Sequence, residues 1–230
     1  MSQAFFFGRR FTLVAVHLTV RFFMDRGKFV VLEGGEGSGK TTILNRLKET
    51  SAVRDGRIKL TREPGGSEFG EQIRNILFSE QGKTFNAQTQ FHLFFAGRTD
   101  HVEKIVAPAL EQGIHVVSDR FAASTFAHQI FGEGHHDLKL LFRTSTDMLK
   151  RWIVPPTYIY LDIEPELGLA RKGKALDGNH YDNRGLDYHH RVRQGYREFA
   201  CHARVVEIDA SRSHDEVWQD FCDSLDKALA

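Results

Sequence analysis

A glycine-rich turn that ends in Lys-Thr-Thr is the stretch of this sequence best suited to bind phosphate. It reads VLEGGEGSGKTT and spans Val31–Thr42, directly after a β-branched apolar run. Four residues separate Gly34 from Gly39, and a Lys-Thr pair follows, which is the P-loop pattern. In such a loop backbone N–H groups surround phosphate oxygens, the lysine reaches the β- and γ-phosphates, and the hydroxyl residue binds Mg²⁺. The predicted nucleotide-binding residues are Gly34, Gly35, Glu36, Gly37, Ser38, Gly39, Lys40, Thr41 and Thr42.

A second set of charged residues indicates that the nucleotide is not the only phosphate ligand. The guanine-reading tetrapeptide Asn-Lys-x-Asp of GTPases occurs nowhere in the sequence. Instead, a strand-like run ends at Asp119 and continues into Arg120, so that a carboxylate for the water shell of Mg²⁺ lies beside a cation for a phosphate. Arg62 follows another such run, and the Pro64 turn directs its side chain. Together with Lys40, these cations indicate two phosphate groups that face each other.

Strand-like runs alternate with helical stretches along most of the chain. The runs KFVVLE, IKLTR, HVVSD, TYIYLD and RVVEID occupy residues 28–33, 58–62, 115–119, 157–162 and 204–209. Helices are expected near 40–50, 67–80, 87–112, 122–131, 137–152, 164–173, 185–203 and 213–229. This alternation predicts an α/β fold, a three-layer doubly wound sandwich with a five-stranded parallel sheet. Ligands of such folds bind beyond the carboxyl ends of the strands, which is where the cations fall.

Composition and charge restrict the class of protein. The 230 residues are 41% hydrophobic and 27% charged, which is ordinary for a globular domain with a real core. A net charge of +1 produces no overall field that would attract nucleic acid or a membrane, so neither is expected as a partner. Cys201 and Cys222 lie far apart, match no metal-binding spacing and suit free thiols in a reducing, cytoplasmic compartment.

The N-terminus and one internal loop differ from the rest of the chain. Residues 1–23 contain three arginines and no acid, and their apolar run 11–20 is too short to span a bilayer. They faintly resemble a twin-arginine signal or a transit peptide, but an upstream start codon with Met24 as the functional start is the preferred interpretation. We therefore expect a dispensable extension followed by a single domain at 24–230. A polar, glycine-containing stretch predicts a lid at about 171–186.

Five blocks of the sequence resemble the thymidylate kinases, the dTMP kinases among the P-loop nucleoside-monophosphate kinases. They are FVVLEGGEGSGKTT, TREPGGSEFGEQIR, FHLFFAGRTDHVEKIVAPAL, VVSDRFAASTFAHQ and PTYIYLDIEPELGLAR, in family order from about residue 27 onward. The resemblance implies an enzyme that transfers the γ-phosphoryl group of MgATP to dTMP, giving dTDP and ADP for dTTP biosynthesis. It also implies a homodimer, to which helix Ala87–Gln112 would contribute. Two alternatives stay open: a related kinase that tolerates dUMP, and a nucleotide-binding module with weakened catalysis.

The resemblance also implies roles for single residues. Arg62 and Arg120 would clamp the phosphate of dTMP, Phe94 would stack on thymine, and Arg98 would hydrogen-bond its edge. Core packing for Phe94 and a surface position for Arg98 are the simpler alternatives. Glu36 would face the acceptor and help to organise Mg²⁺, which Thr41 and Asp119 would hold, in part through water. The predicted dTMP contacts are Glu36, Arg62, Phe94, Arg98, Arg120, Ser124, Thr125 and His128.

The catalytic cation is where the sequence departs from its relatives. Members with glycine at the position of Gly37 supply this cation from the lid, yet His180 stands where the usual lid arginine would be. The lid offers Arg171, Lys172, Lys174 and Arg184, of which Arg171 is the first choice and Lys174 or Arg184 the next. The predicted catalytic residues are Lys40, Arg120, Arg171 and Glu36.

Two substitutions and one loop concern the substrates. Phe121 replaces a common tyrosine, and His128 replaces a tyrosine that packs near the deoxyribose in many members. The stretch Ile208–Ser211 matches the loop that borders the adenine of ATP.

Overall fold

Five buried, β-branched runs form one parallel sheet. A computed structural model of the chain describes residues 26–172 and 184–230. The predictions for residues 1–23, for Lys174 and His180, and for residues 173–183 of the lid expected at about 171–186 lie outside these ranges. The strand order is β2-β3-β1-β4-β5, with every pair parallel. The strands are β1 (Phe29–Gly34), β2 (Ile58–Arg62), β3 (His115–Asp119), β4 (Thr157–Asp162) and β5 (Val205–Asp209). The predicted five-stranded parallel sheet is therefore confirmed.

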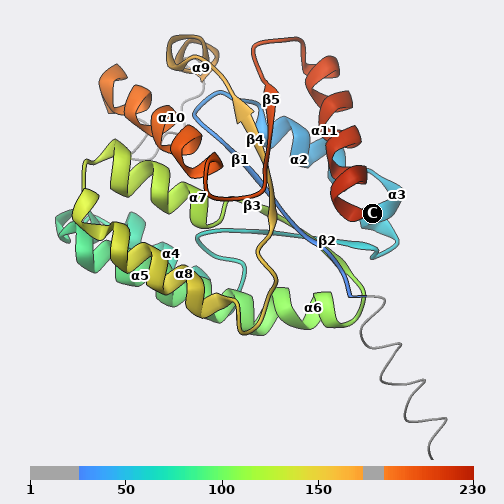
Figure 1. Ribbon diagram of the computed structural model, residues 1–230, viewed down its shortest axis with the longest axis horizontal. Coiled ribbons are helices and arrows are strands. Elements are labelled where there is room, and N and C mark those ends of the chain that lie inside the picture. The colour runs from blue at the N-terminus through green and yellow to red at the C-terminus, as the bar shows by residue number, and fades with distance from the viewer. Residues whose placement is uncertain (1–25, 173–183) are drawn as a thin grey trace, which may run out of the picture.

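Helices cover both faces of the sheet (Figure 1). The α-helices are α2 (Lys40–Lys48), α3 (Ser51–Arg54), α4 (Glu68–Phe78), α5 (Ala87–His101), α6 (Ala107–Glu111), α7 (Ala122–Thr125), α8 (Lys139–Leu149), α9 (Pro165–Lys172), α10 (Leu186–Ala200) and α11 (His214–Leu229). Two π-helical stretches, η2 (Val102–Val106) and η3 (Phe126–Gly132), and two short 3-10 turns, η1 (Gly82–Thr84) and η4 (His136–Leu138), complete the described elements.

The core consists of two apolar layers, one on each face of the sheet. Along β1, Phe29 and Val31 pack with α5, η3, α8 and α10, whereas Val30 and Leu32 face α2 and α11. This alternation is the period-2 geometry of a strand that is buried on both faces. The doubly wound, three-layer arrangement predicted from the sequence is therefore confirmed.

The helices predicted at 87–112 and 122–131 each contain a wider turn. The first continues from α5 through η2 into α6, and Pro108 follows the π-helical stretch. Proline has no N–H to donate to the preceding turn, which explains a change of hydrogen-bond pattern there. The second continues from α7 into η3. Such π-helical turns are frequent near functional sites.

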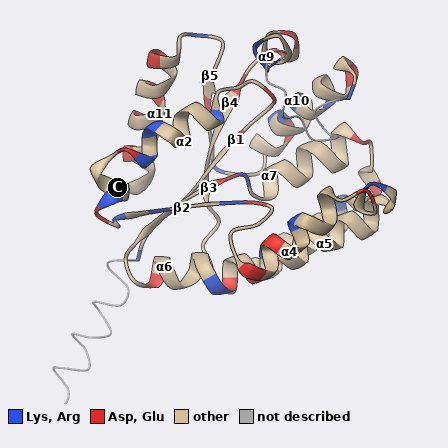
Figure 2. Cartoon of the chain, turned by 180° about the vertical axis from the view of Figure 1, so that it is seen from behind, with Lys and Arg blue, Asp and Glu red and all other residues tan. Residues whose placement is uncertain are grey.

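Parallel pairing brings the predicted cations to one edge of the sheet. Arg62 at the end of β2 lies opposite Asp119 at the end of β3, and Leu32 of β1 lies opposite the same aspartate. Figure 2 shows Lys and Arg interspersed with Asp and Glu over the helices on either side of the sheet. Within the described ranges, no helix combines the length and the apolar character needed to cross a bilayer.

Candidate active site

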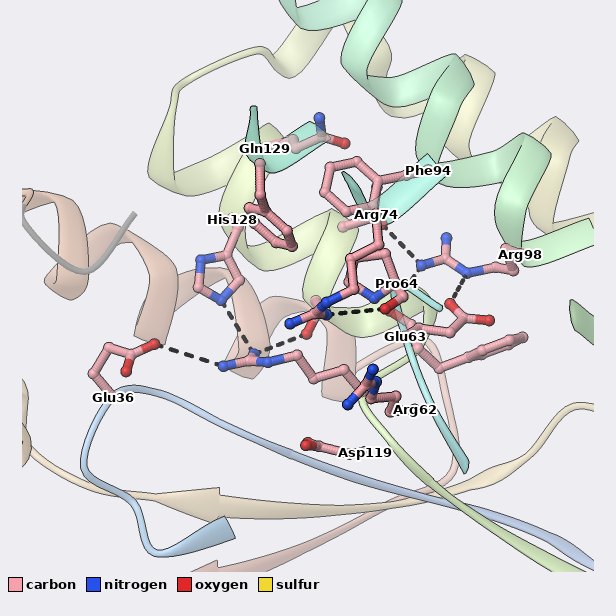
Figure 3. A pocket seen from close by; sticks show the side chains of 15 residues that line it. Glu36, Arg62, Glu63, Pro64, Arg74, Phe94, Arg98, Asp119, His128 and Gln129 are labelled. Atoms are coloured by element: carbon pink, nitrogen blue, oxygen red, sulfur yellow. Dashed lines mark hydrogen bonds and ion pairs between the residues drawn. The ribbon is translucent and has the colours of Figure 1, made fainter. Parts of the chain in front are cut away.

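A cavity of about 260 Å³ opens beyond the carboxyl ends of β1, β2 and β3. Its walls come from the P-loop, the turn after β2, helices α4 and α5, and the segment from the end of β3 through η3 (Figure 3). Every residue predicted to contact dTMP lines this cavity, and so does Asp119: Glu36, Arg62, Phe94, Arg98, Asp119, Arg120, Ser124, Thr125 and His128. Tertiary packing therefore unites residues that are almost one hundred positions apart in the sequence.

The P-loop has the geometry of an anion cradle. Gly37 and Gly39 have positive φ angles of 68° and 91°, which glycine adopts without strain. The ammonium of Lys40 donates to the carbonyl oxygens of Gly34 (2.7 Å) and Gly35 (3.2 Å), so that its side chain lies across the loop. Burial, assisted by the charge of Arg120, lowers the pKa of Lys40 to about 8. A bound phosphate would restore the charge of this lysine.

We expect nucleotide affinity to fall as the pH rises through the pKa of Lys40. Below about pH 8 the ammonium is charged and can neutralise phosphate, and above it the affinity for MgATP is expected to drop by up to roughly tenfold per pH unit. Burial moves the pKa of His128 well below this window and that of Tyr196 above it. Equilibrium titrations with MgATP from about pH 7 to about pH 9.5 measure the profile. Lys40→Arg, whose guanidinium does not titrate, is the control and should bind with a flat profile; a flat wild-type profile would contradict the assignment.

Close packing against α9 determines what the P-loop can carry. A methyl group added at Gly37 would overlap the carbonyl oxygen of Gly168 in α9, and one added at Gly168 would overlap the carbonyl oxygen of Glu36. The two backbones are therefore in direct contact. A P-loop arginine at position 37 has no space in this arrangement.

This packing predicts a difference between two P-loop glycines. Gly39→Ala places a side chain at positive φ with open space around it, which should cost about 1–2 kcal/mol of folding free energy. Gly37→Ala adds the overlap with Gly168 and should cost about 1–3 kcal/mol more. Denaturant unfolding of both variants without nucleotide measures the difference. Equal losses would show that α9 moves away from the P-loop at no cost.

Arg120 lies at the centre of the site. Its backbone has a positive φ of 70°, unusual for a non-glycine residue. Its Nη1 donates to the Ser124 hydroxyl (3.0 Å) and the Tyr196 hydroxyl (3.1 Å), and its Nη2 lies 3.6 Å from Glu36. His128 Nε2, at 3.4 Å, also faces the guanidinium. Arginine can only donate, so Nε2 is the acceptor and Nδ1–H of this neutral ring points to the Tyr188 hydroxyl (3.0 Å).

Arg62 lines the same cavity as Arg120 and is held by an acidic residue of α4. Its Nη2 donates to both carboxylate oxygens of Glu71 at 3.1 Å, and the same carboxylate accepts from the backbone N–H of Gly66. Arg74, which the sequence reasoning missed, lines the same wall, donates to the carbonyl oxygen of Pro64 (2.9 Å) and stacks on Phe78. It lies one helical turn after Glu71, and this spacing could have indicated it.

Phe94 and Arg98 form an apolar slot with a polar edge. Phe91 and Phe95 belong to the core, whereas Phe94 lines the cavity. Arg98 is 3% exposed, so it is not a surface cation. It donates from Nε to Glu63 (2.6 Å) and from Nη2 to the Phe121 carbonyl and the Thr125 hydroxyl (3.1 Å each).

Two buried polar groups in this slot have no protein partner. Nη1 of Arg98 makes no hydrogen bond, and neither amide atom of Gln129 does, although Gln129 is 1% exposed. Figure 3 shows both side chains at the cavity wall near Phe94. Buried polar groups without partners are rare and cost about 1–3 kcal/mol each. A ligand with hydrogen-bonding edges would satisfy them. The sequence reasoning missed Gln129, which the helical spacing of four residues from Thr125 could have indicated.

The three described basic residues of the predicted lid point in different directions. Arg171 donates to the carbonyl oxygens of Ala210 (2.6 Å) and Ser211 (2.8 Å), in the loop expected to border adenine. Arg184 pairs with Glu133 (2.9 Å). Lys172 alone among these three contacts the P-loop, through a 2.6 Å bond to Glu36. The ranking from the sequence, with Arg171 first, stays a prediction, while the contact with the P-loop is made by Lys172.

Charge from three directions acts on Glu36. Burial raises the pKa of this carboxyl, but Lys40, Arg120 and Lys172 together pull it well below its usual range. Glu36 is therefore an anion that connects the P-loop, the end of β3 and the end of α9.

The residues predicted to hold Mg²⁺ fit a water-bridged ion. Oδ1 of Asp119 is buried and makes no hydrogen bond, and Thr41 is exposed in the first turn of α2. In the described part of the chain, no three His, Cys, Asp or Glu side chains gather closely enough to hold a metal by themselves. Mg²⁺ in phosphoryl-transfer sites keeps several waters and binds phosphate oxygens, so this sparse donor set is compatible with it.

Comparisons with known proteins agree with this geometry. The family model for thymidylate kinase matches residues 32–221. A thymidylate kinase from Shouchella clausii is 37% identical over 214 residues, covering 90% of this chain and 98% of its own. One from Nitratidesulfovibrio vulgaris is 35% identical over 211 residues, covering 88% and 97%. The crystal structure of thymidylate kinase from Ehrlichia chaffeensis superposes with a TM-score of 0.63 at 28% identity, over 87% of this chain and 99% of that one.

Proposed function

The chain belongs to the thymidylate kinase family, and on this premise we propose that it transfers the γ-phosphoryl group of ATP to dTMP, giving dTDP and ADP. The observation that carries the proposal is the single cavity in which the P-loop acid Glu36 faces Arg62, Arg120 and the slot beside Phe94. One end of the cavity suits a nucleotide phosphate and the other suits a base. This arrangement places a monophosphate next to the donor.

The cationic end of the cavity suits the phosphate of dTMP. Arg62 and Arg120 approach from the ends of neighbouring strands, and Arg74 adds a third guanidinium. The second pKa of a phosphate monoester is about 6, so dTMP is already a dianionic nucleophile at neutral pH and needs no general base. Catalysis then consists of aligning two polyanions and neutralising charge on the transferred group. Mg²⁺ near Thr41 and Asp119 would neutralise phosphate charge when bound.

The slot beside Phe94 suits the imide edge of thymine. The free Nη1 of Arg98 can donate to a carbonyl oxygen, and the Gln129 amide can accept from N3–H and donate to a second carbonyl. Cytosine presents an amino group where thymine presents O4 and would leave the arginine unsatisfied. Uracil has the same edge and dUMP has the same deoxyribose, so only the 5-methyl group of thymine distinguishes dTMP from dUMP.

Lys172 is the cation that we place on the transferred phosphoryl group. The close contact between Gly37 and Gly168 holds α9 against the P-loop, and Lys172 is one helical turn beyond Gly168 on the same face. A γ-phosphate in the cradle would offer its ammonium a second anion beside Glu36. Arg171 would instead support the adenine-bordering loop through its bonds to Ala210 and Ser211.

A homodimer is supported by apolar side chains on one flank of the molecule. Phe69 and Ile76 on α4 are each 40% exposed, and Leu140 and Met148 on α8 are 75% and 60% exposed. Both helices contact α5, whose own apolar residues are largely in the core. Leu140→Glu should therefore shift the sedimentation profile toward a monomer.

The exposed Cys201 and the part-buried Cys222 are free thiols, as suits a cytoplasmic enzyme. The single domain at 24–230 with a dispensable 1–23 stays a prediction.

A coupled assay over four acceptors tests the proposal. Turnover of ATP with dTMP should exceed that with dCMP and dGMP by several orders of magnitude, and that with dUMP by a smaller factor. Equal or faster turnover of dUMP would favour the dUMP-tolerant alternative. Binding of ATP and dTMP without formation of dTDP would favour the nucleotide-binding module. Arg62 and Arg120 in one cavity, next to a P-loop that retains Lys40, support catalysis.

A further inference from the structure

Glu33 is a buried carboxylate directly before the P-loop. It is the penultimate residue of β1, is completely inaccessible to solvent and immediately precedes Gly34. By the alternation of the strand it faces the same layer as Phe29 and Val31, which is otherwise apolar. A buried acid at such a position is expensive unless its hydrogen bonds are satisfied.

Four hydrogen bonds satisfy this carboxylate. Its Oε1 accepts from the backbone N–H groups of Phe121 (2.9 Å) and Ser124 (3.1 Å), at the start of α7. Its Oε2 accepts from the hydroxyls of Ser124 (2.7 Å) and Tyr196 (3.1 Å). Glu33 therefore joins the strand that enters the P-loop to the helix that follows Arg120 and to α10.

The two hydroxyls connect Glu33 to Arg120. Ser124 and Tyr196 each have one hydroxyl proton, and each also accepts a hydrogen bond from Nη1 of Arg120. The guanidinium can only donate, so both hydroxyl oxygens accept from it, and each hydroxyl keeps its single proton for an ionised Glu33 or for the other hydroxyl, which lies 3.1 Å away. Oε2 of Glu33 itself lies 4.0 Å from Nη1 of Arg120. The carboxylate of Glu33 thus helps to orient the hydroxyls of Ser124 and Tyr196, whose oxygens accept hydrogen bonds from Arg120.

We propose that Glu33 is a positioning residue that orients Arg120 toward the acceptor phosphate by polarising Ser124 and Tyr196. The inference rests on the proposed function, in which Arg120 binds the phosphate of dTMP. Glu33 links the site of the phosphate donor to the site of the acceptor. It directly precedes the P-loop in the sequence, and it accepts hydrogen bonds from the backbone N–H groups of Phe121 and Ser124, which follow Arg120. In-line transfer depends on such relative placement at the scale of an ångström.

Binding of dTMP compared with thymidine tests the proposal. In Glu33→Gln the amide keeps one oxygen for the backbone N–H groups but turns an NH₂ donor toward the hydroxyls, which reverses at least one of them against Arg120. The Kd of dTMP should rise on the order of 10- to 100-fold, as expected for a lost charge-assisted hydrogen bond. The Kd of thymidine, which has no phosphate for Arg120, should change by less than about twofold. Calorimetric titration of each ligand, with thermal melts to verify folding, gives the ratio of the two constants.

Two further variants separate positioning from a general structural effect. Tyr196→Phe removes only one of the two hydroxyls, so it should also lower the preference for dTMP over thymidine, but by a smaller factor. This variant still tests the proposal if Glu33→Gln does not fold. Asp162→Asn is the matched control, because Asp162 is a buried acid at the end of β4 that binds Arg193 and Arg197 of the same α10. This variant should lower the stability of the fold but keep the wild-type preference for dTMP over thymidine.

The outcomes distinguish this inference from the function on which it rests. If both Glu33→Gln and Tyr196→Phe retain the wild-type preference for dTMP, or if Glu33→Gln weakens both ligands equally, the positioning role is wrong. If the wild type itself binds thymidine as tightly as dTMP, the proposed function is wrong.

Discussion

Replacing Lys172 by methionine is expected to lower kcat on the order of 10²-fold, with the KM values of ATP and dTMP changed by less than about threefold. The physical reason is that a cation that meets the transferred phosphoryl group acts mainly in the transition state, where charge spreads over the equatorial oxygens. In the structure this ammonium already lies 2.6 Å from Glu36 of the P-loop. Steady-state kinetics with both substrates varied measure the effect.

Arg171→Met is the matched variant, because it removes a neighbouring cation of the same helix. Since Arg171 binds the carbonyl oxygens of Ala210 and Ser211, its loss should raise the KM of ATP more than it lowers kcat. The sequence alone ranks Arg171 first as the catalytic cation, and that ranking predicts the opposite result. A kcat defect in Arg171→Met with a near-normal Lys172→Met would restore the sequence-based assignment.

Glu63→Gln is expected to destabilise the protein by about 3–5 kcal/mol, the usual cost of removing one member of a buried ion pair. The side chains of Arg98 and Glu63 are only 2% and 5% exposed, and their nitrogen and oxygen lie 2.6 Å apart. The same carboxylate bonds Nδ1 of His101 (3.0 Å), whose Nε2 faces the Thr61 hydroxyl (2.7 Å). Without the acid, the guanidinium of Arg98 stays buried and uncompensated. Denaturant unfolding measures the loss.

The chain offers a matched control in a second Glu–Arg pair. Glu71 and Arg62 are joined at 3.1 Å, but their side chains are 42% and 55% exposed. Water screens such a pair, so Glu71→Gln should cost no more than about 1 kcal/mol. Similar losses for the two variants would mean that Arg98 reaches solvent when Glu63 is neutral. In that case its free Nη1 would also be a poor indicator of a ligand.

Local patterns in the sequence were sufficient for the fold and the phosphate cradle. Five β-branched runs separated by helical stretches predicted the parallel sheet, and the structure confirms it. The motif around Lys40 identified the P-loop, because its glycines and lysine act through backbone geometry that is set within a few residues. The blocks around Arg62, Phe94 and Arg120 indicated an acceptor site, and the fold places all three at one cavity.

The sequence could not show which of several similar residues faces that cavity. Gln129 and Arg74 carry no motif of their own, and they line the site only because η3 and α4 turn those positions toward it. Arg98 could be read equally well as a surface cation until its burial beside Glu63 was known. In the sequence, Glu33 belongs to an apolar, strand-like run. Its hydrogen-bond partners Ser124 and Tyr196 are more than ninety residues away along the chain.

From the sequence alone, the P-loop motif indicated nucleotide binding, and the resemblance to thymidylate kinases with glycine at position 37 predicted that a catalytic cation comes from the lid. The tertiary structure adds that Lys172 contacts Glu36 of the P-loop, whereas Arg171 contacts Ala210 and Ser211. Adjacent residues on a helix point about 100° apart, so the way in which α9 packs selects which of them meets the P-loop. That packing follows from the backbone contact between Gly37 and Gly168, two glycines more than one hundred residues apart.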